Sequence, residues 1–238
     1  RMRRSRHGWM LGAQPFQPPS RTGQPMLEPG ATIGILGGGQ LGRMLSVAAA
    51  RLGFKTCIFE PAGDCPASHV ANFHYKVAYD DVAALTRFAQ SVDVVTYEFE
   101  NIPTAALDVI EAIKPIHPGR EALRISQDRL TEKDFLAQLG LTPAPYANVE
   151  SLSDLAAALA QIGAPAILKT RRFGYDGKGQ VRLREASEAA SAWAQMADAP
   201  CVLEGFVDFT AEISVIAARG QDGRVVAFDP GQNVHVDG

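Results

Sequence analysis

A short apolar run that ends in three glycines constrains the fold of this chain more than any other feature. Residues 31–36 read Ala-Thr-Ile-Gly-Ile-Leu, and Gly-Gly-Gly-Gln-Leu-Gly follows at 37–42. Apolar runs of this length are typical of buried strands in parallel sheets. A glycine turn between such a strand and a helix lets backbone N–H groups at the helix N-terminus approach an anion. The sequence therefore predicts a strand–turn–helix unit that can bind an anionic group.

Strands and helices alternate along the next part of the chain, as far as Ile116. We expect strands at residues 55–59, 75–78 and 92–97 and a last strand at Ile116, with helices at residues 40–52, 82–90 and 104–113. The first helix carries one apolar face, made of Leu41, Met44, Leu45 and Ala48. Alternation of this kind implies a parallel, doubly wound sheet.

The pattern changes after Pro118, where the regular alternation ends. Helices are expected at residues 120–125, 127–139, 152–162 and 187–196, and antiparallel strands at 166–170, 179–183, 201–207, 212–218 and 224–229. Pro143 and Pro145 make residues 140–145 an extended connector. The expected fold class is α/β: an open parallel, Rossmann-like α/β domain at residues 26–125, followed by an α+β domain at 126–238 that reads as incomplete at its C-terminal side.

Residues 1–25 differ in character from the rest of the chain. Four arginines cluster within the first six residues, and the residues that follow show no hydrophobic periodicity. Because the segment has no apolar core, we do not expect it to be a secretory signal, whereas an Arg-rich transit peptide stays open. Because Met26 directly precedes the first strand, we expect residues 1–25 to be an unstructured leader or a tag-like extension.

The composition argues against several classes of protein. A net charge of −3 gives no argument for nucleic acid or a membrane surface as a general partner. No apolar run approaches the roughly 20 residues of a membrane helix. The three cysteines, Cys57, Cys65 and Cys201, show no metal-ligand spacing, and their odd number fits a reducing cytosol better than a disulfide framework. We therefore expect a cytoplasmic protein that has neither nucleic acid nor a membrane as a partner.

The glycine loop at residues 37–42 has three open interpretations. Glu60 ends the next strand, about where a dinucleotide fold places its ribose-binding acid, so an NAD-dependent oxidoreductase accounts for residues 31–60. The loop can instead hold a phosphorylated substrate. Its glycines can also serve only the close packing of strand and helix.

A second glycine-rich segment favours a triphosphate ligand in the later part of the chain. Lys169 is the one charged residue of an apolar strand, and residues 173–180 read Phe-Gly-Tyr-Asp-Gly-Lys-Gly-Gln. Free N–H donors, a mobile cover and the cations Lys169 and Lys178 suit a triphosphate. The alternative is an ordinary surface hairpin with an Asp-Gly turn.

Two carboxylates stand at the ends of neighbouring strands after this segment. Glu204 closes one apolar strand and Glu212 opens the next, and such carboxylates can accept hydrogen bonds from ribose hydroxyls. The alternative for each is a solvated strand residue. Upstream, Arg129 and Lys133 lie one helical turn apart, and an exposed, charged helix face is the alternative for both.

Five motifs lie in a fixed order along the chain. They are Gly-Gly-Gly-Gln-Leu-Gly-Arg-Met at 37–44, Thr-Tyr-Glu-Phe-Glu-Asn at 96–101, Gln-Asp-Arg-Leu-Thr-Glu-Lys at 127–133, Gly-Tyr-Asp-Gly-Lys-Gly-Gln at 174–180 and Asn-Val-His-Val-Asp-Gly at 233–238. In this order they resemble the ATP-grasp superfamily, and within it the 5-(carboxyamino)imidazole ribonucleotide synthase family. The resemblance implies an ATP-dependent ligase of de novo purine biosynthesis. Such an enzyme carboxylates 5-aminoimidazole ribonucleotide with bicarbonate and releases ADP and phosphate. The resemblance also implies a homodimer.

The resemblance further implies a role for each matched position. Arg129 and Lys169 would contact the ATP phosphates, beneath a lid loop made of Gly174, Tyr175, Asp176, Gly177, Lys178, Gly179 and Gln180. Adenine would lie against Glu204, Gly205, Phe206 and Val207, the ribose at Glu212, and His235 would complete the ATP site. The ribonucleotide would lie against Gly39, Gln40, Leu41 and Glu98, and Tyr175, Asp176 and Lys178 would face it as catalytic residues.

Magnesium is the cofactor that the resemblance implies beside ATP. Its ligands are expected beyond residue 238, so we expect no metal ligand within this chain. Without the metal, the charge that develops on the transferred phosphate lacks a neutralising partner. We therefore expect this chain to bind its ligands weakly and to turn over poorly. A truncated, inactive ATP-binding fragment is the non-enzyme alternative.

Overall fold

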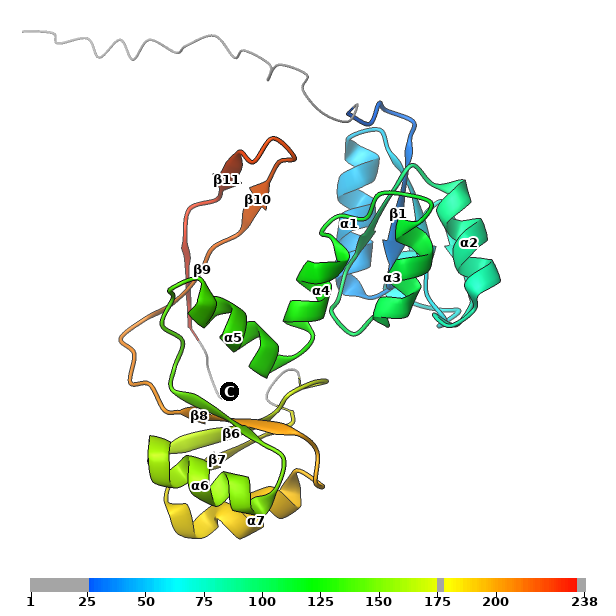
Figure 1. Cartoon of the computed structure of the whole chain (residues 1–238). Helices are drawn as coiled ribbons and strands as arrows, with labels where there is room; N and C mark the ends of the chain where they lie inside the picture. The colour runs from blue at the N-terminus through cyan, green and yellow to red at the C-terminus, as the bar shows by residue number, and fades with distance from the viewer. Residues whose placement is uncertain (1–25, 175–177, 235–238) are drawn as a thin grey trace, which may run out of the picture. The chain divides into compact units, whose positions relative to one another are not determined.

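The computed structural model describes residues 26–174 and 178–234, and its first sheet is parallel (Figure 1). Strands β1 (Thr32–Leu36), β2 (Lys55–Phe59), β3 (Phe73–Tyr75) and β4 (Val94–Tyr97) lie in the order β3-β2-β1-β4. Helices α1 (Gln40–Arg51), α2 (Val82–Ser91) and α3 (Thr104–Glu111) and the 3₁₀ turn η1 (Pro66–His69) connect and flank these strands. The predicted parallel α/β part is confirmed.

Two details of this part differ from the prediction. The third strand lies at Phe73–Tyr75 rather than at 75–78, because Cys57, Ile58 and Phe59 of β2 pair with Phe73, His74 and Tyr75. Ile116 does not begin a full strand but forms an isolated parallel bridge with Val95.

Aromatic side chains from β2, β3 and α2 fill much of the core beside this sheet. The ring centroid of Phe59 lies 5.4 Å from that of Phe88 and 6.0 Å from that of Tyr75. Gly34 on β1 makes room for these rings, since a Cβ at this position would lie 2.7 Å from Phe88. The core thus fixes β1 and, with it, the glycine loop that follows.

Helix α1 packs through its small residues and exposes its apolar face. Its buried residues are Gly42, Ser46 and Ala49. Leu41 and Met44 are more than half exposed, at 56% and 58%. Small side chains let the helix approach β2 and η1 closely, as at Gly42, where a Cβ would lie 3.3 Å from the carbonyl oxygen of Gly37. The apolar periodicity of this helix therefore does not mark its buried side.

The second four-stranded sheet of the described chain is antiparallel, as predicted. Strands β5 (Tyr146–Val149), β8 (Cys201–Gly205), β6 (Ala166–Thr170) and β7 (Gln180–Leu183) lie in that order. Helices α6 (Leu152–Ile162) and α7 (Ala189–Gln195), the latter preceded by the 3₁₀ turn η2 (Ala186–Glu188), cover one face. Side chains alternate across a strand, so Leu168 and Leu203 point into this core and Lys169 and Glu204 lie on the opposite face. Strand β5 was not predicted.

Two helices lie between the two sheets in the sequence. They are α4 (Arg120–Ser126) and α5 (Arg129–Gln138). The second helix begins at Arg129 rather than at residue 127, because the Asp128 carboxylate accepts hydrogen bonds from the N–H groups of Leu130 and Thr131, at 3.0 and 3.2 Å. An aspartate in this position is a common helix N-cap.

Four short strands complete the described chain. Residues 213–231 form a compact unit of their own, in which β10 (Ala217–Arg219) and β11 (Val225–Ala227) pair as an exposed antiparallel hairpin. β9 (Glu212–Ser214) and β12 (Gly231–Asn233) pair with each other. The single strand predicted at 212–218 is thus two strands, β9 and β10, and β12 was not predicted.

Within residues 26–174 and 178–234, no helix has both the length and the apolar character of a membrane span.

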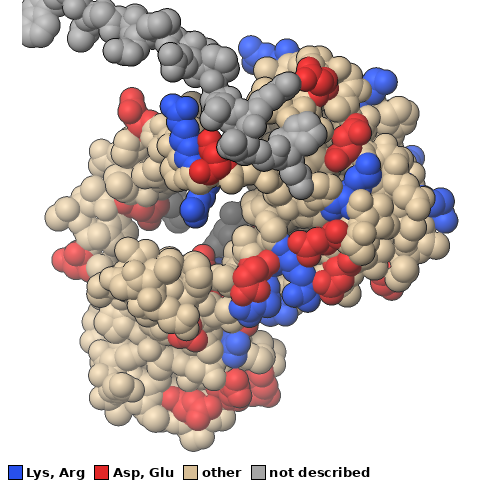
Figure 2. Space-filling model, turned by 45° about the horizontal axis from the view of Figure 1, so that its top comes forward, with Lys and Arg blue, Asp and Glu red and all other residues tan. Residues whose placement is uncertain are grey.

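Figure 2 shows lysine and arginine side chains interspersed with aspartate and glutamate on the face in view.

Candidate active site

Three charged side chains meet on the polar face of the antiparallel sheet. Oε2 of Glu204 on β8 lies 2.8 Å from Nζ of Lys169 on β6, and Oε1 lies 3.2 Å from Nζ of Lys133 on α5. All three side chains are largely buried, with exposed fractions of 11% for Glu204, 21% for Lys169 and 14% for Lys133. Two ammonium groups and one carboxylate leave this cluster with a net positive charge.

The strand register explains why these groups meet. Glu204 lies opposite Ile167 on β6, so Lys169, two residues along, is its diagonal neighbour on the same face. On the other side of β8, Tyr146 of β5 lies opposite Glu204. The Lys133 ammonium sits over the Tyr146 ring, 5.6 Å from its centroid. The cluster therefore rests on three strands and one helix.

The electrostatics of Glu204 follow from two opposing effects. Burial, the largest single effect, raises the pKa of its carboxyl group. The hydrogen bond and charge of Lys169, together with the charge of Lys133, lower the pKa by more, so the net direction is below the ordinary value of 4.5. Glu204 is therefore ionised at neutral pH and compensates both lysines.

The glycine-rich segment begins and ends next to Thr170, at the end of β6. The N–H of Thr170 donates to the carbonyl oxygen of Gly179 at 2.8 Å. Arg129 donates to the carbonyl oxygen of Gly174 at 3.0 Å, so the predicted phosphate contact touches the predicted lid directly. Gly179 has a φ of 69°, a backbone conformation that favours glycine. The predicted site residues Tyr175, Asp176 and Gly177 lie outside the described residues.

The predicted adenine segment follows the end of β8. Backbone hydrogen bonds fix its course, from the N–H of Gly205 to Pro145 at 2.8 Å and from the N–H of Phe206 to Pro165 at 3.1 Å. The Phe206 ring lies 4.5 Å from the guanidinium carbon of Arg182 on β7 and is 43% exposed. Val207 is also exposed. The Phe206 ring is thus accessible to a planar ligand beside Arg182.

The predicted ribose residue Glu212 lies on β9. Its Oε1 accepts a hydrogen bond from the amide of Asn233 on β12, at 2.8 Å. His235, which the sequence also assigns to the ATP site, lies outside the described residues.

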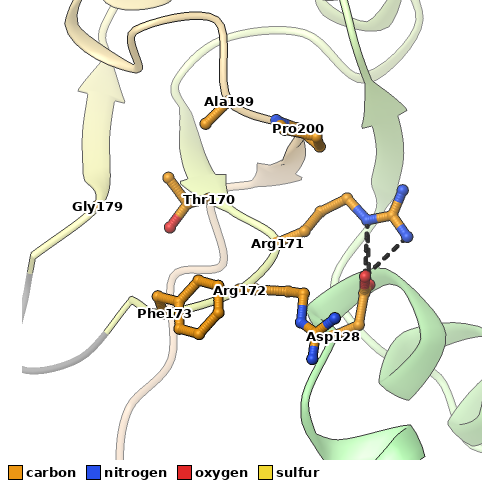
Figure 3. Close-up of a pocket in the computed structure, with 8 residues that line it drawn as sticks. All are labelled: Asp128, Thr170, Arg171, Arg172, Phe173, Gly179, Ala199 and Pro200. Atoms are coloured by element: carbon orange, nitrogen blue, oxygen red, sulfur yellow. Dashed lines mark hydrogen bonds and ion pairs between the residues drawn. The ribbon is translucent and has the colours of Figure 1, made fainter. Parts of the chain in front are cut away.

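A pocket of about 650 Å³ opens at the base of the glycine-rich segment (Figure 3). It is lined by Asp128, Thr170, Arg171, Arg172, Phe173, Gly179, Ala199 and Pro200. Nε of Arg171 lies 3.1 Å from both carboxylate oxygens of Asp128, and Nη2 of Arg171 lies 2.8 Å from Oδ2 of Asp128. This pair joins the start of α5 to the chain beyond β6. Neither Lys169 nor Glu204 lines the pocket, so it adjoins the charged cluster without containing it.

The glycine loop after β1 holds a carboxylate of the protein itself. Glu98 accepts hydrogen bonds from the N–H groups of Gly39 at 2.7 Å and Gly42 at 2.9 Å. Gln40 and Leu41, at the start of α1, are exposed beside it. Two of the N–H donors at this loop, those of Gly39 and Gly42, are therefore occupied by Glu98, which weakens the support for a dinucleotide here. Glu60, the predicted ribose acid of that interpretation, accepts hydrogen bonds from Ala62 and Tyr79 instead.

Sequence reasoning missed part of this arrangement. Lys133 was assigned no role beside its exposed-face alternative, yet it is one of the two partners of Glu204. Its spacing from Arg129 was a signal, but only the tertiary fold shows that the side chain turns toward β8. The Asp128–Arg171 pair was also missed, because 43 residues separate the two. Among the described residues, no group of three His, Cys, Asp or Glu side chains is placed to hold a metal ion.

Two family models match the chain in succession. A ribonucleotide synthetase preATP-grasp domain matches residues 30–127, and an ATP-grasp domain matches residues 134–238. The parallel sheet lies in the first match, and the antiparallel sheet with Lys169 and Glu204 lies in the second, which begins one residue after Lys133. The fold and the site thus define an ATP-grasp protein.

Individual relatives narrow this class. N5-carboxyaminoimidazole ribonucleotide synthase of Brucella melitensis is 53% identical over 214 residues, which make up 89% of this chain and 59% of the relative. The Staphylococcus aureus N5-carboxyaminoimidazole synthetase solved with ADP has a TM-score of 0.84 at 38% identity, over 88% of this chain and 56% of that chain. The Aspergillus clavatus enzyme solved with ADP and 5-aminoimidazole ribonucleotide has a TM-score of 0.78 at 27% identity, over 88% and 55%.

Over most of its own length the chain is thus similar to N5-carboxyaminoimidazole ribonucleotide synthases. It spans 59% of the length of the Brucella relative and 56% of the Staphylococcus structure.

Proposed function

We propose that this chain carries the ATP-binding and ribonucleotide-binding parts of an enzyme that carboxylates 5-aminoimidazole ribonucleotide. The observation that carries the proposal is the Lys169–Glu204 pair on the polar face of the second sheet, next to a glycine-rich segment. Cations beside a glycine-rich segment, on an accessible face, suit a nucleoside triphosphate. Relatives solved with ADP, and in one case also with the ribonucleotide, support the same assignment.

The proposed reaction has two bond-forming steps. A bicarbonate oxygen attacks the terminal phosphorus of ATP, which gives carboxyphosphate and ADP. The amine of the ribonucleotide then attacks the carboxyl carbon, or the CO₂ released from it, and loses a proton as the C–N bond forms. Phosphate leaves, and N5-carboxyaminoimidazole ribonucleotide is the product. Carboxyphosphate is short-lived in water, so a cover over the site serves the reaction.

Each predicted residue has a place in this proposal. Lys169 and Arg129 bind phosphates beneath the segment 174–180. The segment from Glu204 to Val207 binds adenine, Glu212 the ribose, and His235 lies in the same site. Gly39, Gln40, Leu41 and Glu98 face the ribonucleotide, and Tyr175, Asp176 and Lys178 act on it from the cover.

Several wider assignments are also part of the proposal. We infer two domains, at about residues 26–125 and 126–238, since each contains its own sheet and its own buried cluster. The proposal includes a homodimer in the cytoplasm and magnesium as the cofactor that neutralises phosphate charge. Among the described residues no group of three His, Cys, Asp or Glu side chains is placed to hold a metal ion, and Glu204 already compensates two lysines.

The test is a panel of thermal unfolding curves of the purified chain with ATP plus magnesium, 5-aminoimidazole ribonucleotide, and NAD. A ligand at about a hundred times its Kd adds roughly 2.7 kcal/mol to the stability of a two-state fold and shifts Tm by a few degrees. We expect ATP and the ribonucleotide to raise Tm and NAD to leave it unchanged. Stabilisation by NAD alone would overturn the proposal.

A further inference from the structure

Lys133 makes a contact that the proposed function has not used. It lies on α5, outside the sheet, and its ammonium reaches Oε1 of Glu204 at 3.2 Å with only 14% of the side chain exposed. A lysine is seldom buried to this extent unless it is paired. Burying it beside another ammonium group, that of Lys169, adds repulsion that a purely structural contact would avoid.

Glu204 divides its two oxygens between the two lysines. Oε2 takes Lys169 at 2.8 Å, and Oε1 takes Lys133 at 3.2 Å. On the proposed function, Lys169 has to turn toward a phosphate when a nucleotide binds. That movement would leave Glu204, with 11% of its side chain exposed, as a buried carboxylate without its nearest partner. Removing one partner of a buried pair is strongly unfavourable because the other charge stays uncompensated.

We propose that Lys133 is a positioning residue that keeps the Glu204 carboxylate paired while Lys169 binds the phosphates of the nucleotide. This inference rests on the proposed nucleotide site. Because Lys133 also lies over the ring of Tyr146, 5.6 Å from its centroid, its ammonium is held at Glu204 rather than free to follow the ligand. Among the described residues, Lys169 lies over no aromatic ring in this way. Lys169 thus exchanges Glu204 for a phosphate when the nucleotide binds, whereas Lys133 stays paired with Glu204.

The test is a double-mutant cycle on ADP affinity, measured by isothermal titration calorimetry. Lys133→Met should weaken ADP binding about tenfold, which corresponds to about 1.4 kcal/mol. Lys133→Arg keeps a cation at this position and should restore most of the affinity. In a Glu204→Gln background there is no carboxylate to compensate, so adding Lys133→Met should change affinity less than twofold. Arg87→Met, at an exposed position on α2, is the matched control and should bind ADP like the wild type.

Two outcomes would overturn the inference. Unchanged ADP affinity in Lys133→Met would make the residue merely structural. If Lys133→Met lowers ADP affinity by the same factor in the wild-type and in the Glu204→Gln background, Lys133 contacts the nucleotide directly. If Lys133→Met does not fold, judged by its circular dichroism, Lys133→Gln takes its place in the cycle. Failure of the wild type to bind any adenine nucleotide would instead refute the proposed function, so the two failures are distinguishable.

Discussion

The carboxylate of Glu98 lies 2.7 Å from the backbone nitrogen of Gly39, the residue that caps helix α1. A second hydrogen bond, from Gly42 at 2.9 Å, completes a cradle for one anion at the positive end of the helix. Glu98→Ala leaves both donors without this acceptor. We expect the free energy of unfolding to fall by about 1–3 kcal/mol, as measured by urea denaturation.

A control for Glu98 is available within the same sheet domain. Glu111→Ala removes an exposed carboxylate at the end of α3 and should change stability by no more than about 0.5 kcal/mol. Equal stability of Glu98→Ala and the wild type would show that the cradle does not hold the carboxylate in solution.

The Glu204 cluster predicts a stability that depends on pH. The pKa of Glu204 is lowered in the folded state, since the two lysines outweigh the effect of burial. Its stabilising contribution is therefore present above the ordinary pKa of 4.5 and is lost as the pH falls through the lower pKa of the folded protein. In Glu204→Gln, this acidic loss of stability should be smaller than in the wild type. Identical pH profiles of stability between about pH 2 and 5 would contradict the assignment.

The Asp128–Arg171 pair should couple the start of α5 to the chain after β6. Arg171 meets the carboxylate with both Nε and a terminal nitrogen, and both side chains are less than a quarter exposed. A double-mutant cycle with Asp128→Ala and Arg171→Ala should give a coupling energy of about 1–3 kcal/mol. Strictly additive effects of the two substitutions would mean that the pair contributes nothing to stability.

The packing of α1 predicts opposite outcomes on its two sides. Ser46 is 1% exposed and its hydroxyl has no partner within the described residues, so Ser46→Ala should not lower stability. Ser46→Leu should lower the free energy of unfolding by about 1–3 kcal/mol because neighbouring atoms already fill the space around the Ser46 side chain. Met44→Gln, on the exposed side, should stay within about 0.5 kcal/mol of the wild type. A large loss in Met44→Gln would show that this face is covered in solution.

Much of the fold was predictable because the local signals agree with one another. The glycine turn after β1 and the alternating strands and helices gave the parallel sheet, and the proline connector gave the change of architecture. The side of α1 that is buried was not predictable, because close approach selects Gly42 and Ala49 over larger residues and periodicity ignores this choice. Strand β5 was missed because Tyr146–Val149 is short and its pairing partner, β8, lies more than fifty residues later.

Part of the candidate site was likewise predictable from the sequence, and part was not. Lys169, Glu204 and the glycine-rich segment stand out in sequence, since each is a polar or flexible interruption of an apolar pattern. Their mutual geometry follows from the register of β6 and β8, which a single sequence does not reveal. The same holds for Lys133, which looks like an ordinary helix cation until the fold brings it to Glu204. Glu98 was predicted near the ribonucleotide, but its hydrogen bonds to the glycine loop were not.

We propose that a nucleotide binds on the polar face of the second sheet through Lys169. This proposal can be tested by isothermal titration of ATP and magnesium into the wild type, Lys169→Met and the control Arg87→Met. We expect saturable binding to the wild type and to Arg87→Met, and at least a tenfold loss of affinity in Lys169→Met, which corresponds to about 1.4 kcal/mol. Equal affinities of Lys169→Met and the wild type would contradict it.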